Sequence, residues 1–244
     1  MIIDISSDAQ ELGVKAAGLA ASRILRAIDE KGEARIAVST GSSQFETLHS
    51  LIGHKIDWSK VEIFHLDEYI GLPVTHAASF RKYLYERFIN HIHPRKFHSV
   101  DVEGSIHERI DTLTREIRKK PVDFGLIGIG VNGHIAFNDP PADFKTTEAY
   151  KIVNLDEVCR KQQVDEGWFG SLSEVPMQAV SMTPYQIMQC LTIISCVPHK
   201  VKSSAIMKML SNRVTEMVPA TLLKQHPDYH LYIDKASAFD IIPL

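Results

Sequence analysis

The stretch Val122-Asp123-Phe124-Gly125-Leu126-Ile127-Gly128-Ile129 decides the fold, because its side chains are almost all apolar. A strand of this composition is typical of a parallel sheet that helices cover on both faces. It runs directly into Gly130-Val131-Asn132-Gly133-His134-Ile135-Ala136-Phe137-Asn138-Asp139, a loop rich in glycine and polar side chains. We therefore expect a buried central strand that ends in a functional loop.

Strand and helix patterns alternate on both sides of this segment. Asp8 is a suitable N-cap, and Gly32 a suitable stop, for a helix over 8–31. Further helices are expected at 44–51, 79–92, 106–119, 185–189, 200–210 and 220–225, and further strands at 35–38, 61–66, 178–182, 191–197 and 229–233. This alternation predicts an α/β fold, an open and mostly parallel sheet with helices on both faces, similar to a modified Rossmann fold. Residues 139–170 are the least periodic and indicate a lid or an irregular excursion.

The composition is that of an ordinary globular protein, with 44% hydrophobic and 23% charged residues in a chain of 244. A formal net charge of -3 without a long basic run gives no sign of a nucleic-acid or membrane partner. The cysteines form no C-x-x-C pair, and the first residues lack the layout of a signal peptide. We expect a cytoplasmic protein with a single domain over 1–244.

Three motifs follow expected strands, and ligands of open α/β sheets bind beyond the carboxyl ends of the strands. The first motif, Ser39-Thr40-Gly41-Ser42-Ser43, comes after the strand at 35–38. Its small residues let the backbone approach an anion, and its hydroxyl and N–H groups donate hydrogen bonds. A phosphate cradle and an ordinary capped turn both fit this motif, whereas the lysine and glycine spacing of a Walker loop are missing.

The second motif is the acidic pair Asp67 and Glu68, followed by Tyr69 and then by Gly71-Leu72-Pro73. A carboxyl group at the end of a strand is suited to proton abstraction if burial raises its pKa. In the alternative interpretation, one carboxylate caps a helix and the other faces solvent.

The third motif is the loop 128–139, in which three glycines allow sharp turns. Its polar side chains are Asn132, His134, Asn138 and Asp139. A histidine beside amides and a carboxylate is suited to general acid–base work near neutral pH. A dinucleotide site would need a further glycine and a helix, which the following prolines disfavour. A turn held by side-chain hydrogen bonds is the structural alternative.

Other residues give weaker signals. His91, His93 and His98 lie close together, but without further convergent ligands we expect no metal site there. Lys200 lies near the start of an expected helix, from which it could reach a bound phosphate.

Two segments resemble signatures of the glucosamine-6-phosphate deaminase family, within the glucosamine-6-phosphate isomerase/6-phosphogluconolactonase superfamily. Phe64-His65-Leu66-Asp67-Glu68-Tyr69-Ile70-Gly71-Leu72-Pro73 resembles the first, and the segment from Gly130 to Asn138 resembles the second. The order of the motifs, their spacing and the chain length are also similar to those of single-domain members.

This resemblance implies conversion of glucosamine 6-phosphate to fructose 6-phosphate and ammonia, without a metal or an organic cofactor. It implies that Asp67 moves the proton between C2 and C1, and that His134 opens the sugar ring with Asn132 and Asp139 beside it. The implied substrate and phosphate contacts are Ser39, Thr40, Gly41, Ser42, Ser43, Glu68, Gly133, Arg160 and Lys200. The implied partner is a small sugar phosphate, and a homo-oligomer is possible.

The chain departs from the family pattern at three positions. Asp139 replaces the usual glutamate, which shortens its reach to His134 by about 1.5 Å, one carbon–carbon bond. Asn132 replaces an aspartate of some members. Gly167 stands where an arginine is usual before the aromatic pair, and Arg160 is the expected substitute.

Three alternatives stay open. An enzyme for galactosamine 6-phosphate would share these motifs. A 6-phosphogluconolactonase resembles the chain less, because its loop lacks the Phe-Asn-acid continuation found at Phe137 to Asp139. A sugar-phosphate sensor without turnover would be expected to carry a DNA-binding segment, for which the short N-terminus leaves no room.

Overall fold

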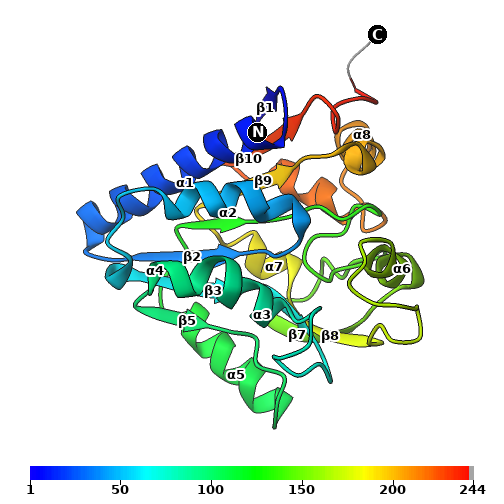
Figure 1. The fold of residues 1–244 in the computed structure, drawn as a ribbon, viewed down its shortest axis with the longest axis horizontal. Coiled ribbons are helices and arrows are strands. Elements are labelled where there is room, and N and C mark those ends of the chain that lie inside the picture. The colour runs from blue at the N-terminus through cyan, green and yellow to red at the C-terminus, as the bar shows by residue number, and fades with distance from the viewer. Residues whose placement is uncertain (242–244) are drawn as a thin grey trace.

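A seven-stranded sheet forms the centre of the computed structural model, in the strand order β1-β10-β9-β6-β2-β3-β5 (Figure 1). Every neighbouring pair is parallel, which confirms the predicted open α/β sheet. Residues 1–241 are described, so the last three residues of the expected domain over 1–244 lie outside the described residues. The strands are β1 (Ile2–Ser6), β2 (Ala34–Val38), β3 (Val61–His65), β5 (Lys96–His98), β6 (Phe124–Leu126), β9 (Thr192–Val197) and β10 (Tyr229–Asp234).

Helices cover both faces of this sheet. The α-helices within residues 1–241 are α1 (Ala9–Lys31), α2 (Phe45–Ile52), α3 (Phe80–Leu84), α4 (Asn90–Ile92), α5 (Ile106–Ile117), α6 (Glu157–Asp165), α7 (Pro184–Ile187) and α8 (Ser203–Ser211). Side chains alternate across a strand, so Ile36 and Val38 of β2 pack with α1 and α2, whereas Ala37 packs with α5 and α8. Both faces of the central strands are therefore buried.

Several boundaries depend on local chemistry. The α1 helix begins where the Asp8 carboxylate accepts a hydrogen bond from the Glu11 N–H at 2.9 Å, and ends at Gly32 with a φ of 76°, as predicted. The helix expected over 79–92 is interrupted by a π-helical turn, Tyr85–Ile89, between α3 and α4. None of the helices within residues 1–241 has the length and apolarity needed to cross a membrane.

A second, antiparallel sheet lies beside the first, in the order β4 (Asp67–Tyr69), β8 (Gln178–Met182) and β7 (Tyr150–Asn154). Together with α6, β7 shows that residues 139–170 are less irregular than predicted. Only Tyr150 of β7 is buried, and α6 buries only Cys159 and Gln163. Neither element therefore produces a clear apolar period in the sequence.

Close packing of α1 against α2 generates a stability prediction. A Cβ on Gly13 would lie 2.6 Å from Glu46 Cβ and 2.7 Å from the Glu46 carbonyl carbon, whereas a Cβ on Gly18 would meet nothing within 4 Å. We expect Gly13→Ala to lower the free energy of unfolding by about 1–3 kcal/mol, because the helices must move apart. Gly18→Ala, the matched control in the same helix, should raise it by up to about 1 kcal/mol. Denaturant unfolding measures both, and equal effects would contradict the packing argument.

Candidate functional site

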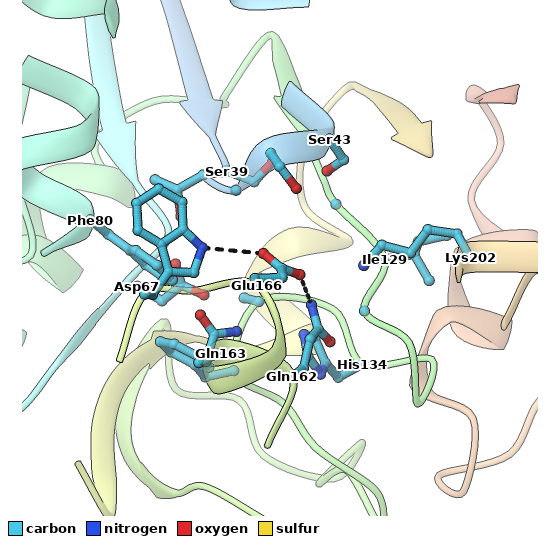
Figure 2. Close-up of a pocket in the computed structure, with 18 residues that line it drawn as sticks. Ser39, Ser43, Asp67, Phe80, Ile129, His134, Gln162, Gln163, Glu166 and Lys202 are labelled. Atoms are coloured by element: carbon cyan, nitrogen blue, oxygen red, sulfur yellow. Dashed lines mark hydrogen bonds between the residues drawn. The ribbon is translucent and has the colours of Figure 1, made fainter. Parts of the chain in front are cut away.

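The carboxyl ends of β2, β3, β6 and β9 open on one cavity, which has about 80 Å³ of space for water-sized molecules (Figure 2). Three expected groups meet there: the loop 39–43, Asp67 and His134. The other lining residues are Phe80, Gly128, Ile129, Gly130, Ala136, Phe137, Gln162, Gln163, Glu166, Trp168 and Lys202. The structure therefore brings all three sequence motifs to one site.

The loop 39–43 is held from outside the cavity. Gly41 adopts a φ of 102°, which favours glycine, and the Tyr83 hydroxyl donates a 2.9 Å hydrogen bond to its carbonyl oxygen. On the other side, the Gln44 side chain donates to Ser43 Oγ at 2.9 Å and to the Cys196 carbonyl of β9 at 3.2 Å. Within residues 1–241, the buried hydroxyl of Ser39 has no hydrogen-bond partner. A loop with fixed hydroxyl and N–H donors is suited to an anion.

Asp67 lies at the floor of the cavity, at the start of β4, with a side chain that is almost wholly buried. Burial raises the pKa of Asp67 from 3.8 to about 8, and the charge of the neighbouring Glu68 acts in the same direction. A carboxyl group that exchanges its proton near neutral pH is suited to act as a base and then as an acid.

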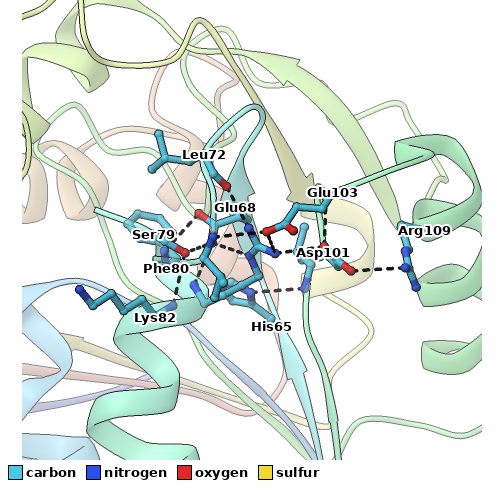
Figure 3. A network of polar contacts seen from close by, with 12 residues as sticks. His65, Glu68, Leu72, Ser79, Phe80, Lys82, Asp101, Glu103 and Arg109 are labelled. Carbon is cyan, nitrogen blue, oxygen red and sulfur yellow. Dashed lines mark hydrogen bonds and ion pairs between the residues drawn. The ribbon is translucent and has the colours of Figure 1, made fainter. Parts of the chain in front are cut away.

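Glu68 does not line the cavity, which corrects its expected role in substrate binding. Its buried carboxylate instead caps α3 and pairs with Arg81 at 3.2 Å (Figure 3). Arg81 also pairs with Asp101 at 3.0 Å and Glu103 at 3.2 Å. The donors to Glu68 are the N–H groups of Tyr69, Phe80 and Arg81, the Ser79 hydroxyl and the Arg81 guanidinium. This network fixes the strand that carries Asp67.

His134 and Asp139 lie together, as the sequence suggested. His134 Nδ1 is 3.0 Å from Asp139 Oδ1, although the ring N–H direction deviates from the line to this oxygen. The shorter aspartate reaches the histidine because Ala136, with a φ of 47°, turns the chain back between them. Burial alone would raise the pKa of Asp139, but the contact with His134 and donors from Asp156 and Asn132 hold it below its usual range.

Asn132 and Gly133, both expected at the site, lie outside the cavity lining. The Asn132 side chain accepts from the His134 N–H at 3.0 Å and donates to Asp139 Oδ1 at 3.1 Å, so it positions the pair. Gly133 has a φ of 86° and lies against Val218. A Cβ on Gly130, by contrast, would lie 2.3 Å from His134 Nε2, so this glycine makes room for the imidazole.

One wall of the cavity comes from α6 and the residues just after it, which the sequence predicted only as part of a lid or an irregular excursion. Gln162 accepts from the Val131 N–H at 3.2 Å and donates to Glu166 at 2.6 Å, while the Trp168 indole donates to Glu166 at 3.2 Å (Figure 2). Arg160, the expected substitute for the missing arginine, is turned away. Its guanidinium donates to the carbonyl of Val175 at 3.1 Å and so holds the next loop.

Lys202, not Lys200, is the lysine of the cavity. The Lys200 ammonium lies 4.3 Å from the centre of the Phe239 ring, outside the lining. Lys202, two residues later in the 3-10 turn Lys200–Lys202, is buried in the cavity wall. Burial lowers the pKa of Lys202, and the charge of Glu166 acts against this shift. Its place directly before α8, which starts with Ser203, is the sequence signal that could have identified it.

Known proteins resemble this chain over most of its length. The family model for glucosamine-6-phosphate isomerases/6-phosphogluconolactonase matches residues 7–231. The glucosamine-6-phosphate deaminase of Staphylococcus epidermidis is 36% identical over 234 residues, which cover 91% of this chain and 93% of that protein. That of Thermoanaerobacter pseudethanolicus is 33% identical, with coverage of 100% and 96%.

Solved structures of the same two kinds of enzyme are similar to this chain. A monomeric glucosamine-6-phosphate deaminase superposes with a TM-score of 0.90 at 27% identity, covering 98% of this chain and 100% of the other. A 6-phosphogluconolactonase from Neisseria gonorrhoeae, with a TM-score of 0.77, 20% identity and coverage of 96% and 99%, shares the fold.

The raised pKa of Asp67 generates a prediction about stability and pH. In the unfolded chain this carboxyl group ionises near 3.8, but in the folded protein it ionises only near about 8. The wild type therefore loses stability as the pH rises between these values, by up to about 1.4 kcal/mol per pH unit. Asp67→Asn cannot ionise, so the melting temperature of the variant minus that of the wild type should grow from pH 5 to pH 8 and then level off.

Thermal melts across this pH range check the prediction. Asp143→Asn is the control, because the exposed Asp143 has a pKa lowered mainly by Lys151. A difference for Asp67→Asn that does not change with pH would contradict the assigned burial effect.

Proposed function

Because the chain belongs to the glucosamine-6-phosphate isomerase/6-phosphogluconolactonase family, we propose that it is an enzyme that converts an amino-sugar 6-phosphate, glucosamine 6-phosphate, to fructose 6-phosphate and ammonia. The observation that carries this proposal is the buried carboxyl of Asp67 in the same cavity as His134. Relatives at 33–36% identity that carry the name glucosamine-6-phosphate deaminase support it.

Ring opening is the first step and uses His134. Opening a pyranose moves a proton from the O1 hydroxyl to the ring oxygen O5, which an imidazole accomplishes as base and then as acid. His134 lines the cavity while its Nδ1 edge lies against Asp139. A carboxylate in this place orients the imidazole and stabilises its charged form.

Proton transfer between carbons is the second step and uses Asp67. Its carboxylate removes the C2 proton of the open-chain sugar to give an enolamine, and the same group returns a proton to C1. Water then adds to the resulting imine, and its hydrolysis gives the ketose and ammonia. Since Asp67 must be ionised to start this step, activity should rise with pH toward about 8.

Substrate recognition divides between two regions of the cavity. The hydroxyls of the loop 39–43 and the Lys202 ammonium are suited to the phosphate, which anchors the sugar beneath the reacting groups. The Glu166 carboxylate, held by Gln162 and Trp168, adds a negative charge that favours an amino sugar over a neutral one. We also predict that the chain forms one domain, is located in the cytoplasm and assembles into a homo-oligomer.

A substrate panel tests the proposal. We expect the purified protein to release ammonia and form a ketose phosphate from glucosamine 6-phosphate. Galactosamine 6-phosphate and 6-phosphogluconolactone are assayed in parallel, with ammonia, ketose phosphate and acid followed separately. A preference for galactosamine 6-phosphate would reassign the sugar, and lactone hydrolysis without ammonia release would overturn the deaminase function.

The two nearby lysines provide a matched test of the phosphate site. Lys202→Met removes the cation of the cavity and should raise KM for the sugar phosphate at least about tenfold, the loss expected for a charged hydrogen bond. Lys200→Met removes an exposed cation outside the cavity and should leave KM within about twofold. Steady-state kinetics at constant ionic strength give the KM of both variants. A larger increase in KM for Lys200→Met than for Lys202→Met would assign the phosphate contact to Lys200.

A further inference from the structure

A cluster of metal-ligating atoms lies behind the cavity, where α6 meets the loop 128–139. Asp139 offers a carboxylate oxygen, His134 offers a ring nitrogen, and Cys159 in the first turn of α6 offers Sγ. These three atoms all lie within 4.8 Å of one another. Nothing in the reaction proposed above uses the thiol of Cys159.

We propose that His134, Asp139 and Cys159 form an inhibitory site for a thiophilic divalent cation such as Zn²⁺. Nitrogen, sulfur and carboxylate oxygen are the three ligand types that Zn²⁺ takes in proteins, at about 2.0–2.3 Å. Small side-chain movements bring ligand atoms at the observed separations to these distances.

The surroundings of the three ligands favour a cation. Asp156 adds a second carboxylate, which accepts hydrogen bonds from the Cys159 N–H at 2.5 Å and from the Asn132 amide at 3.3 Å. Within residues 1–241, Nδ1 of His134 is buried without a well-directed hydrogen bond. This nitrogen is therefore available as a ligand.

Metal binding requires deprotonated ligands, so the metal competes with protons for its site. The ion bonds to the thiolate of Cys159, whose proton passes to solvent, and to Nδ1 of the neutral His134 tautomer that carries its proton on Nε2. Metal affinity should therefore increase with pH.

The bound ion would stop the enzyme without touching the phosphate site. A metal on Nδ1 keeps the imidazole from becoming the positively charged imidazolium that ring opening requires, so ring opening fails. Lys202 and the loop 39–43 lie on other walls of the cavity and stay free. Inhibition should thus lower kcat far more than it changes the affinity for inorganic phosphate.

Binding can be measured independently of turnover. Cd²⁺ is titrated into the full-length protein in chelator-free buffer, and thiolate-to-metal charge transfer is followed in the ultraviolet. We expect one Cd²⁺ per chain, release of protons and full reversal by EDTA. Zn²⁺ is then assayed as an inhibitor with the substrate that proves active. The spectral result stands even if amino-sugar turnover fails, so the two proposals are tested separately.

Cysteine variants identify the site. Cys159→Ala should lose the ultraviolet band and raise the Zn²⁺ concentration for half-inhibition at least about tenfold, while activity without metal persists. Cys159→Val, which fills the buried space better, repeats the test if the alanine variant unfolds. Cys190→Ala is the control, because that buried thiol packs against Gly125 in the main sheet. Equal band intensity and inhibition in all variants, or no band in the wild type, would overturn the proposal.

Discussion

Parallel pairing of the central strands is the constraint on which the site depends. Val38 of β2 lies level with both His65 of β3 and Leu126 of β6, and Leu126 lies level with Ile194 of β9. The chain therefore leaves β2, β3 and β6 at one height on one edge of the sheet, and β9 extends beyond this level to Val197. The residues that follow these strands therefore line the same crevice at this edge of the sheet.

Three buried carboxyl groups near this edge have different environments and hence different uses. Glu68 is satisfied by Arg81 and the start of α3, so its charge is structural. Asp139 keeps a low pKa because the contact with His134 and the donors from Asp156 and Asn132 outweigh burial. Asp67 lies in the cavity wall with a raised pKa, which makes it the group able to exchange a proton. Environment, not residue type, assigns the roles.

The sequence was sufficient where a motif directly follows a strand, since strand direction alone places Asp67 and His134. The sequence was insufficient where the position of a side chain depends on contacts with residues distant in the chain. Lys200 and Lys202 lie at the two ends of one 3-10 turn, and of these two lysines only Lys202 is buried. The wall from α6 is polar where it faces the cavity, so it leaves no apolar period. The reach of Asp139 depends on the positive φ of Ala136, a backbone state that side-chain composition does not reveal.

The strand order also governs how the protein is made. Ile2 of β1 lies opposite His230 of β10, and α1 packs with Ile194 and Cys196 of β9 in one buried cluster. Elements synthesised before β9 and β10 thus lack part of their packing surface until those strands have been made. The sheet is completed by pairings between distant parts of the chain, which makes folding slower than in a fold held by local contacts.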